Sequence, residues 1–188
     1  MSDKILLHTC CGPCVIYPLE ELRKKFDVTS FFYNPNIYPH REYERRRITM
    51  EEYLRSEGIP VVYSSVSERY EDFLTAVKGR EERRCEVCYR MRLEESAKKA
   101  AETGYKFFSS TLLYSIYMNH EKLKELSQEI SRAYNLDFVY DDFRRGWRRG
   151  VEESLKIKMY RQKYCGCAFS FSERSQRIKE KEKRKRSK

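Results

Sequence analysis

The chain has 188 residues, enough for one domain of ordinary size with a short appendage. Hydrophobic residues make up 40% of it and charged residues 36%, a polar composition that still excludes intrinsic disorder. The net charge is +10, and no stretch approaches the roughly 18 apolar residues of a membrane span or the roughly 7 to 15 of a signal-peptide core. We therefore expect a cytoplasmic protein with no membrane association.

Short apolar runs alternate along the chain with longer, charged segments of helical periodicity. The apolar runs predict strands at residues 4–8, 28–33, 61–64, 106–109 and 138–140. The charged segments predict helices at residues 15–26, 40–57, 86–103, 121–134 and 151–164. Strands and helices in alternation indicate parallel βαβ units, and hence a three-layer, Rossmann-like α/β domain.

The positive charge is concentrated at the carboxyl end. Residues 173–188 contain nine basic and three acidic side chains, and so carry +6 of the +10. We expect a single α/β catalytic and metal-binding domain over residues 1–172, followed by a basic tail over 173–188 that is frayed, or helical without packing on the domain. Such a tail indicates a polyanionic partner, RNA or DNA by default, although a solvated extension that promotes solubility has the same composition.

The first cysteines lie where an open α/β sheet binds its ligands, at the carboxyl end of a strand. Cys10 and Cys11 follow the first predicted strand and precede the first predicted helix. This segment contains one glycine, Gly12, and neither GxGxxG nor GxxxxGKS/T, so it does not indicate a phosphate-binding loop. The sequence instead predicts a cysteine-based site at this edge of the sheet.

Seven cysteines in a chain without an export signal indicate metal or redox chemistry, because a reducing cytosol disfavours structural disulfides. They form three groups: Cys10, Cys11 and Cys14; Cys85 and Cys88; Cys165 and Cys167. The adjacent residues Cys10 and Cys11 suit the separate irons of a cluster better than one tetrahedral zinc. With the CxxC pair Cys85 and Cys88 they provide the four thiolates that a [4Fe–4S] cluster takes, and we predict the cluster on these four residues.

Three thiols remain outside that set: Cys14, Cys165 and Cys167. A disulfide across the single glycine between Cys165 and Cys167 would close a small, strained ring, and strained bridges tend to be labile or catalytic. The alternative is a second metal, such as mononuclear iron, on Cys14 and this pair, with a coordination position open for water or substrate. A third interpretation is one closed zinc site with spare buried thiols. The sequence leaves all three open.

The remaining candidate side chains are isolated or lie in basic runs. His8, His40 and His120 each stand alone, and we interpret them as hydrogen-bonded structural residues. Trp147 lies among arginines in residues 143–149, where it could stack on an unpaired base or pack at the rim of the domain. These arginines and the run at 45–47 are the predicted phosphate contacts of the domain itself.

Six ordered segments carry a resemblance. They are LLHTCCGPC (6–14), YNPNIYPHREYERR (33–46), RCEVCYRMRL (84–93), STLLYS (110–115), DDFRRG (141–146) and YRQKYCGCAFS (160–170). Together they resemble the epoxyqueuosine reductase family QueH, from residue 5 to about 172 and with all seven cysteines in place. The resemblance implies a fold related to the adenine-nucleotide alpha-hydrolases, and a cobalamin-independent oxidoreductase. This enzyme would reduce the epoxide of epoxyqueuosine in tRNA to queuosine, the last step of that wobble-base modification.

The resemblance also implies an iron–sulfur cluster on Cys10, Cys11, Cys85 and Cys88, with redox or metal roles for Cys165 and Cys167. Losing the epoxide oxygen as water takes two electrons, two protons and stabilisation of the leaving oxygen. A cluster supplies electrons one at a time from a donor that the sequence does not identify, and an iron with an open position would bind the oxygen as a Lewis acid. The six segments quoted above contain three candidates for proton donation: Asp142, Tyr160 and Arg161.

Two other classes of function compete with this reading. A zinc-stabilised RNA-binding module without catalysis would account for the CxxC pair and the positive charge, but not for the adjacent cysteines or the CxC pair. A tRNA sulfur-transfer enzyme would share the thiols and the fold. It requires an ATP site, however, and the chain lacks the SGGxDS-type loop that ATP-using relatives carry after the first strand.

Overall fold

Five parallel strands form the central sheet of the computed structural model, which describes residues 2–65 and 69–186. The strands are β1 (Asp3–His8), β2 (Phe26–Phe32), β3 (Val61–Tyr63), β4 (Phe107–Ser110) and β5 (Asp137–Phe138). Their order across the sheet is β3-β2-β1-β4-β5, and each neighbouring pair is parallel. This topology confirms the predicted Rossmann-like α/β class, and it places the carboxyl ends of β1 and β4 side by side.

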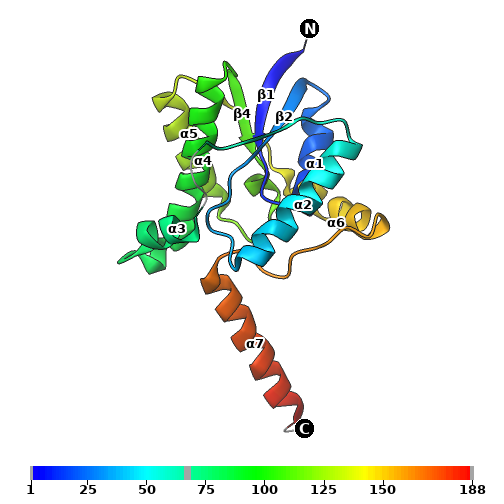
Figure 1. The fold of residues 1–188 in the computed structure, drawn as a ribbon, viewed down its shortest axis with the longest axis vertical. Helices are drawn as coiled ribbons and strands as arrows, with labels where there is room; N and C mark the ends of the chain where they lie inside the picture. Colours follow the sequence, from blue (N-terminus) through cyan, green and yellow to red (C-terminus); the bar gives the residue numbers. More distant parts are fainter. Residues whose placement is uncertain (1, 66–68, 187–188) are drawn as a thin grey trace.

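Helices cover both faces of the sheet and complete the three predicted layers (Figure 1). One side carries α1 (Gly12–Leu22), α2 (His40–Ser56) and α6 (Trp147–Lys156). The other side carries α3 (Tyr70–Val77), α4 (Arg84–Glu102) and α5 (His120–Ala133). Short 3-10 helices occur at Glu81–Arg83 (η1), Thr111–Tyr114 (η2) and Phe143–Gly146 (η3). The last helix, α7 (Ala168–Arg186), projects away from the body of the molecule (Figure 1).

β1 lies in the middle of the sheet, between β2 and β4. Its side chains Ile5, Leu6 and Leu7 have no exposed surface, as expected of a parallel strand that helices cover on both faces. This burial explains why the strand appears in the sequence as a continuous apolar run rather than an alternating one. The core therefore fixes the point at which β1 ends and the cysteine segment begins.

His8, the last residue of β1, has the structural role expected from the sequence. Its Nε2 donates to the carbonyl oxygen of Tyr33 at 3.1 Å, so Nδ1, 2.9 Å from Ser110 Oγ, accepts from that hydroxyl. Burial, together with the charge of Arg92, lowers the pKa of His8 to about 4. The ring is therefore neutral at physiological pH, and both of its nitrogen atoms are engaged.

Several element boundaries differ from the sequence-based expectation. α1 ends at Leu22, ahead of the predicted end at 26, because Phe26 already pairs with Asp3 in the sheet. The predicted strand 138–140 is shorter and earlier, at Asp137–Phe138, and α3 was not predicted.

The predicted helix over 151–164 is wrong in its extent. α6 spans Trp147–Lys156, and the backbone at Lys158 has φ of 54°, a left-handed conformation that terminates a helix. The following residues, 157–167, are irregular. This segment brings Gln162 and Cys165 to the carboxyl end of β1, which a continued helix would not do.

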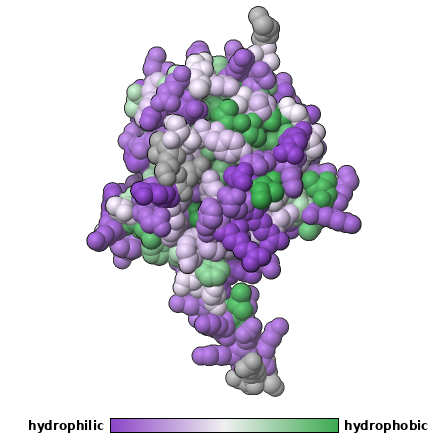
Figure 2. Space-filling view, viewed as in Figure 1, coloured by the Kyte–Doolittle hydropathy of each residue, from purple (hydrophilic) through white to green (hydrophobic). Residues whose placement is uncertain are grey.

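The basic tail forms part of α7, which begins at Ala168, inside the region predicted as the domain. Near its start the helix contacts the body: Glu173 pairs with Arg84, and Arg174 Nη1 donates to the carbonyl oxygen of Lys163 at 3.2 Å. From residue 176 to 185 every side chain is exposed, and the surface along this helix is mostly hydrophilic (Figure 2). Across residues 2–65 and 69–186, no helix is both long and apolar enough to cross a lipid bilayer.

Gly146 marks a close approach between η3 and α1, and it yields a stability prediction. A Cβ atom added at this position would overlap three ring carbons of Tyr17, a buried residue whose hydroxyl accepts a hydrogen bond from Arg145 Nε at 3.1 Å. We expect Gly146→Ala to lower the free energy of unfolding by roughly 1–3 kcal/mol, the usual cost of overpacking a core. Urea denaturation of the parent protein and the variant measures this difference in unfolding free energy. Adding Tyr17→Leu should recover part of the loss, whereas an unchanged midpoint in the single variant would contradict the overlap.

Candidate active site

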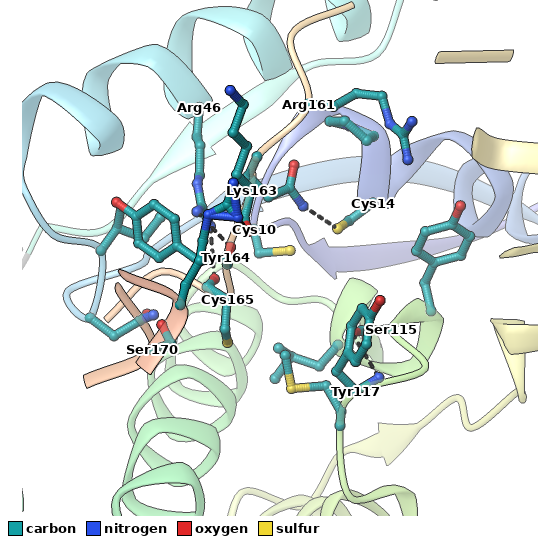
Figure 3. A pocket seen from close by; sticks show the side chains of 18 of the residues that line it. Cys10, Cys14, Arg46, Ser115, Tyr117, Arg161, Lys163, Tyr164, Cys165 and Ser170 are labelled. Atoms are coloured by element: carbon teal, nitrogen blue, oxygen red, sulfur yellow. Dashed lines mark hydrogen bonds between the residues drawn. The ribbon is translucent and has the colours of Figure 1, made fainter. Parts of the chain in front are cut away.

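A cavity of about 680 Å³ opens at the carboxyl ends of β1 and β4 (Figure 3). Its wall includes Cys10 and Cys14 beside the start of α1, Thr111 after β4, and Cys165 from the irregular segment before α7. Figure 3 shows the three cysteine side chains around one hollow, with the loop that carries Tyr117 on another side. This is the sheet edge at which the sequence predicts a cysteine-based site.

Cys10, Cys11 and Cys14 form a thiol triad, with all three sulfur atoms within 4.8 Å of one another. The triad follows from local structure: β1 ends at His8 and α1 begins at Gly12, so Cys10 and Cys11 occupy the turn and Cys14 the first helical turn. Hydrogen bonds from the Cys11 and Cys14 thiols hold the pKa of Cys10 well below its usual range. Burial raises the pKa of Cys11. A thiol with a lowered pKa beside two further thiols is a suitable arrangement for metal ligation.

Gln162 contacts this triad from the irregular segment 157–167. Its Nε2 donates to the sulfur of Cys11 at 3.0 Å and to that of Cys14 at 3.3 Å. Its Oε1 is buried and has no hydrogen-bond partner among the residues that the structure describes. Amide donors of this kind stabilise ligand sulfurs. Gln162 was not predicted as a site residue, because it lies 151 positions from Cys11 and no spacing relates them.

The other four cysteines gather between the start of α4 and the start of α7. Burial raises the pKa of Cys88 to about 12 and that of Cys165 to about 11, and the charges of the neighbouring thiols add to both shifts. Both Cys88 and Cys165 have Cys85 and Cys167 as neighbours. Cys85 and Cys165 also have solvent-exposed surface. Such thiols are protonated at neutral pH, so metal binding here would release protons.

Arg92 interacts with both groups of thiols, the triad and the four cysteines near the starts of α4 and α7. It is buried, and it donates to the Cys88 sulfur at 3.1 Å and to the Cys88 carbonyl oxygen at 3.2 Å. Its charge also acts on Cys10 and on Cys165. A buried cation beside thiols favours their ionised form. Arg92 follows Cys88 by one helical turn, a spacing that would have identified it in the sequence.

Arg46 fixes the loop that carries Cys165 and Cys167. Its side chain is 2% exposed, and it donates to the carbonyl oxygen of Cys165 at 2.8 Å and to that of Tyr164 at 3.0 Å. A third donor, Nε, binds Glu42 Oε1 at 2.8 Å. Gly166, between the two cysteines, has φ of 147°, which favours glycine. The CxC loop is therefore held by backbone contacts to one buried guanidinium.

Among the three candidates for proton donation, only Arg161 lines the cavity. Tyr160 donates to Glu42 Oε2 at 2.7 Å instead. Hydrogen bonds from Arg144 lower the pKa of Asp142 to about 2, so this carboxylate is ionised at neutral pH and has no proton to give. Nδ1 of the buried His120 lies 4.0 Å from Asp142, outside the cavity lining.

The cavity has an aromatic wall and a basic wall. The ring of Trp147 packs against Tyr114, with centroids 5.2 Å apart, and against Tyr117 at 5.9 Å. Side chains of α7, among them Arg174, Arg177 and Lys181, line the other part. Trp147 therefore packs at the rim of the domain, which was one of its two interpretations.

Acidic neighbours pair with most of the arginines around Trp147. Arg145 lies 2.7 Å from Asp141, and Arg149 lies 2.6 Å from Glu20. These pairs reduce the charge that residues 143–149 offer to a polyanion. The arginines and lysines of α7 are the stronger basic surface beside the cavity.

The donor set fits a metal or iron–sulfur centre. All seven cysteines are free thiols, and soft thiolate ligands select iron–sulfur clusters or zinc. The unpartnered carboxamide oxygen of Gln162 and the lowered pKa of Cys10 mark the thiol triad as the focus of the site. Within the described ranges, no other group of three histidine, cysteine, aspartate or glutamate side chains comes as close together.

Comparisons with known proteins agree with these features. A protein-family model described as "Epoxyqueuosine reductase QueH" matches residues 5–173. Proteins with the same description from Staphylococcus aureus and Thermotoga maritima are 35% and 36% identical, over 90% and 94% of this chain and 76% and 94% of their own. A solved structure, the predicted subunit of a tRNA methyltransferase from Methanocaldococcus jannaschii, has a TM-score of 0.52 at 10% identity, over 80% of this chain and 74% of that one. This last similarity concerns the fold alone.

Proposed function

Because the chain belongs to the epoxyqueuosine reductase QueH family, which converts epoxyqueuosine to queuosine in tRNA, we propose that this reduction takes place in the cavity lined by Cys10, Cys14 and Cys165. The observation that carries the proposal is that one cavity joins cysteines from two distant parts of the chain at the carboxyl end of β1. Its basic and aromatic walls suit an RNA substrate.

We assign the cofactor to Cys10, Cys11, Cys85 and Cys88, as a [4Fe–4S] cluster. When bound, this cluster would supply electrons one at a time from an external donor. The assignment is supported by the lowered pKa of Cys10 and by Arg92, whose charge acts on Cys10 while its side chain binds Cys88. Gln162 donates to the sulfurs of both Cys11 and Cys14, which supports the thiol triad as a ligand site, and the spacing of the cysteines selects Cys11 for the cluster.

The remaining thiols, Cys14, Cys165 and Cys167, are proposed as the reacting set. Deoxygenation of an epoxide to an alkene and water consumes two electrons and two protons. Oxidation of the Cys165–Cys167 dithiol to a disulfide releases the same number of each, so the two half-reactions balance. Two electrons from the external donor and two protons from water would then return the disulfide to the dithiol. A mononuclear iron on the three thiols is the alternative role for this set. Arg46 fixes the Cys165 carbonyl and thereby the position of the reacting pair.

Two cations of the cavity wall, Arg161 and Lys163, suit the developing charge on the epoxide oxygen. Their side chains enter the lining from the same irregular segment as Gln162 (Figure 3). A preorganised cation in a partly enclosed site stabilises a leaving oxygen more strongly than water does. The chain itself therefore provides orientation and electrostatic stabilisation for the reaction.

The direct test uses the full chain, purified without oxygen, and tRNA that carries epoxyqueuosine. With a chemical reductant, we expect queuosine to appear in nuclease digests of the tRNA, detected by mass spectrometry as the loss of one oxygen atom. Iron and acid-labile sulfide near four per chain would accompany activity. Stoichiometric zinc without sulfide, and no conversion after attempted reconstitution of the cluster, would contradict the proposal and favour a non-catalytic RNA-binding module.

In this proposal the tRNA binds through its wobble-base region, and the basic tail contacts its phosphates. Deleting residues 173–188 removes +6 of charge, and it also removes Arg174, Arg177 and Lys181 from the cavity wall. We expect weaker tRNA binding and a flatter dependence of log Kd on log salt concentration, because fewer counterions are released. Filter binding between about 50 and 200 mM salt measures the slope. Iron content should not change, and an unaltered slope would reduce the tail to a solubility element.

A further inference from the structure

Tyr117 is the most exposed of the large apolar side chains in the described parts of the chain, at 79% exposure. It lies in the segment between η2 and α5 and lines the cavity that contains Cys10 and Cys165 (Figure 3). A single exposed aromatic residue on a protein surface needs no explanation by itself. The packing and the charge around this one point to a ligand.

The ring of Tyr117 packs against an aromatic cluster. It meets Trp147 edge to face, with centroids 5.9 Å apart and planes at 88°. Trp147 in turn packs on the buried Tyr114, whose hydroxyl donates to the Trp147 carbonyl oxygen at 3.0 Å. The backbone N–H of Tyr117 donates to Ser115 Oγ at 3.3 Å. The aromatic cluster therefore supports the ring from one side, while most of its surface stays open at the cavity mouth.

The same cavity is strongly basic. Its lining includes Arg161 and Lys163 from the irregular segment and Arg174, Arg177 and Lys181 from α7. Of the lining residues that the structure describes, Glu173 is the one acidic residue, and it pairs with Arg84. An open aromatic ring beside a row of cations is the combination that binds single-stranded nucleic acids, in which bases stack while the backbone follows the charge.

We propose that Tyr117 is a stacking platform for an unpaired nucleobase of the RNA loop that presents the substrate, with the adjoining phosphates along the basic face of α7. This inference rests on the proposed function for the identity of the RNA. It makes Tyr117 a binding residue for the substrate loop, and it assigns Trp147 to supporting that ring rather than to stacking on the base.

The test compares Tyr117→Ala with Tyr117→Phe in the full chain. The probe is a fluorescently labelled anticodon stem–loop RNA, and Kd is measured by anisotropy. Loss of one base-stacking contact should weaken binding roughly 5- to 100-fold in Tyr117→Ala. Tyr117→Phe keeps the ring and should stay within about twofold of the parent protein. In turnover with modified tRNA, KM should rise for Tyr117→Ala while kcat at saturating tRNA stays unchanged, as expected for lost binding.

Two controls separate stacking from other effects. Ile116→Ala alters an exposed neighbour in the same loop that does not line the cavity, and it should leave Kd unchanged. Abasic substitution of each loop nucleotide in turn should identify one position at which the RNA loses affinity and at which Tyr117→Ala has no further effect. The emission of Trp147, the only tryptophan, reports whether the aromatic cluster of each variant is intact.

The outcomes distinguish this inference from the function on which it rests. Equal binding by Tyr117→Ala and the parent protein would overturn the stacking platform and leave the reductase assignment in place. Equal losses in Tyr117→Ala and Tyr117→Phe would also overturn it, because the contact would then belong to the hydroxyl. Failure of the parent protein to bind any RNA would overturn the proposed tRNA substrate and the platform with it.

Discussion

Cys85→Ala should lose both the iron of the cluster and the reductase activity, whereas Cys165→Ala should keep the iron chromophore and turn over poorly. The difference follows from the assignment of Cys85 to the four-thiolate set and of Cys165 to the reacting set. The cluster content of each variant is measured after anaerobic purification, by iron and acid-labile sulfide analysis and by visible absorption. We expect about four irons per chain in the parent protein and in Cys165→Ala, and far less in Cys85→Ala. Loss of the chromophore in Cys165→Ala would contradict this division of the cysteines.

Cys14→Ala is the decisive companion to these two variants. The assignment places Cys14 in the reacting set, so its replacement should leave iron and sulfide unchanged and lower turnover. The sulfur of Cys14 nevertheless lies within 4.8 Å of those of Cys10 and Cys11, two of the four residues assigned to the cluster. If Cys14→Ala loses the chromophore and Cys85→Ala keeps it, Cys14 is a cluster ligand and Cys85 belongs to the reacting set.

Arg46→Met should destabilise the fold and impair catalysis through the CxC loop. The substitution leaves the carbonyl oxygens of Cys165 and Tyr164 without their buried donor and removes the cation that pairs with Glu42. Breaking a buried ion pair costs on the order of 3–5 kcal/mol of unfolding free energy. Because displacement of a reacting group by about 1 Å can cost on the order of 100-fold in rate, we expect a loss of that size in kcat.

Arg47→Met provides a matched control on the same helix. Arg47 pairs with Glu44 and Glu51 at the surface, and its side chain is 30% exposed, so its loss should change stability by no more than about 1 kcal/mol. Urea denaturation and turnover of the two variants are compared under the same conditions. Equal effects of Arg46→Met and Arg47→Met would show that the three buried hydrogen bonds do not position the loop.

The local elements were predictable because their signals lie close together in the sequence. The apolar run of β1 and the charged periodicity of α2 each depend on neighbouring residues, and both elements appear at the predicted places. The location of the candidate site was predictable for the same reason. Parallel topology brings the carboxyl ends of the strands to one edge, and the first three cysteines directly follow β1.

The boundaries that failed depend on contacts between distant segments. Helical periodicity continues past residue 156, yet the chain leaves α6 there, and the irregular segment that follows places Gln162 against Cys11 and Cys14. Propensity is a weak preference that tertiary packing overrides. The aromatic cluster around Trp147 likewise joins the start of α6 to η2 and to the loop after η2, segments that no periodicity relates.

The sequence by itself therefore determined the fold class, the family and the edge of the sheet at which the cysteines gather. Tertiary structure decided which side chains surround those cysteines. Arg92 lies between the two gatherings of thiols, Arg46 fixes the CxC loop, and Tyr117 stands open at the cavity mouth. Residue spacing encodes only the neighbours along one element, as it does for Arg92 and Cys88 on α4, whereas the contacts of Arg46 and Tyr117 arise when segments distant in the sequence pack at the same end of the sheet.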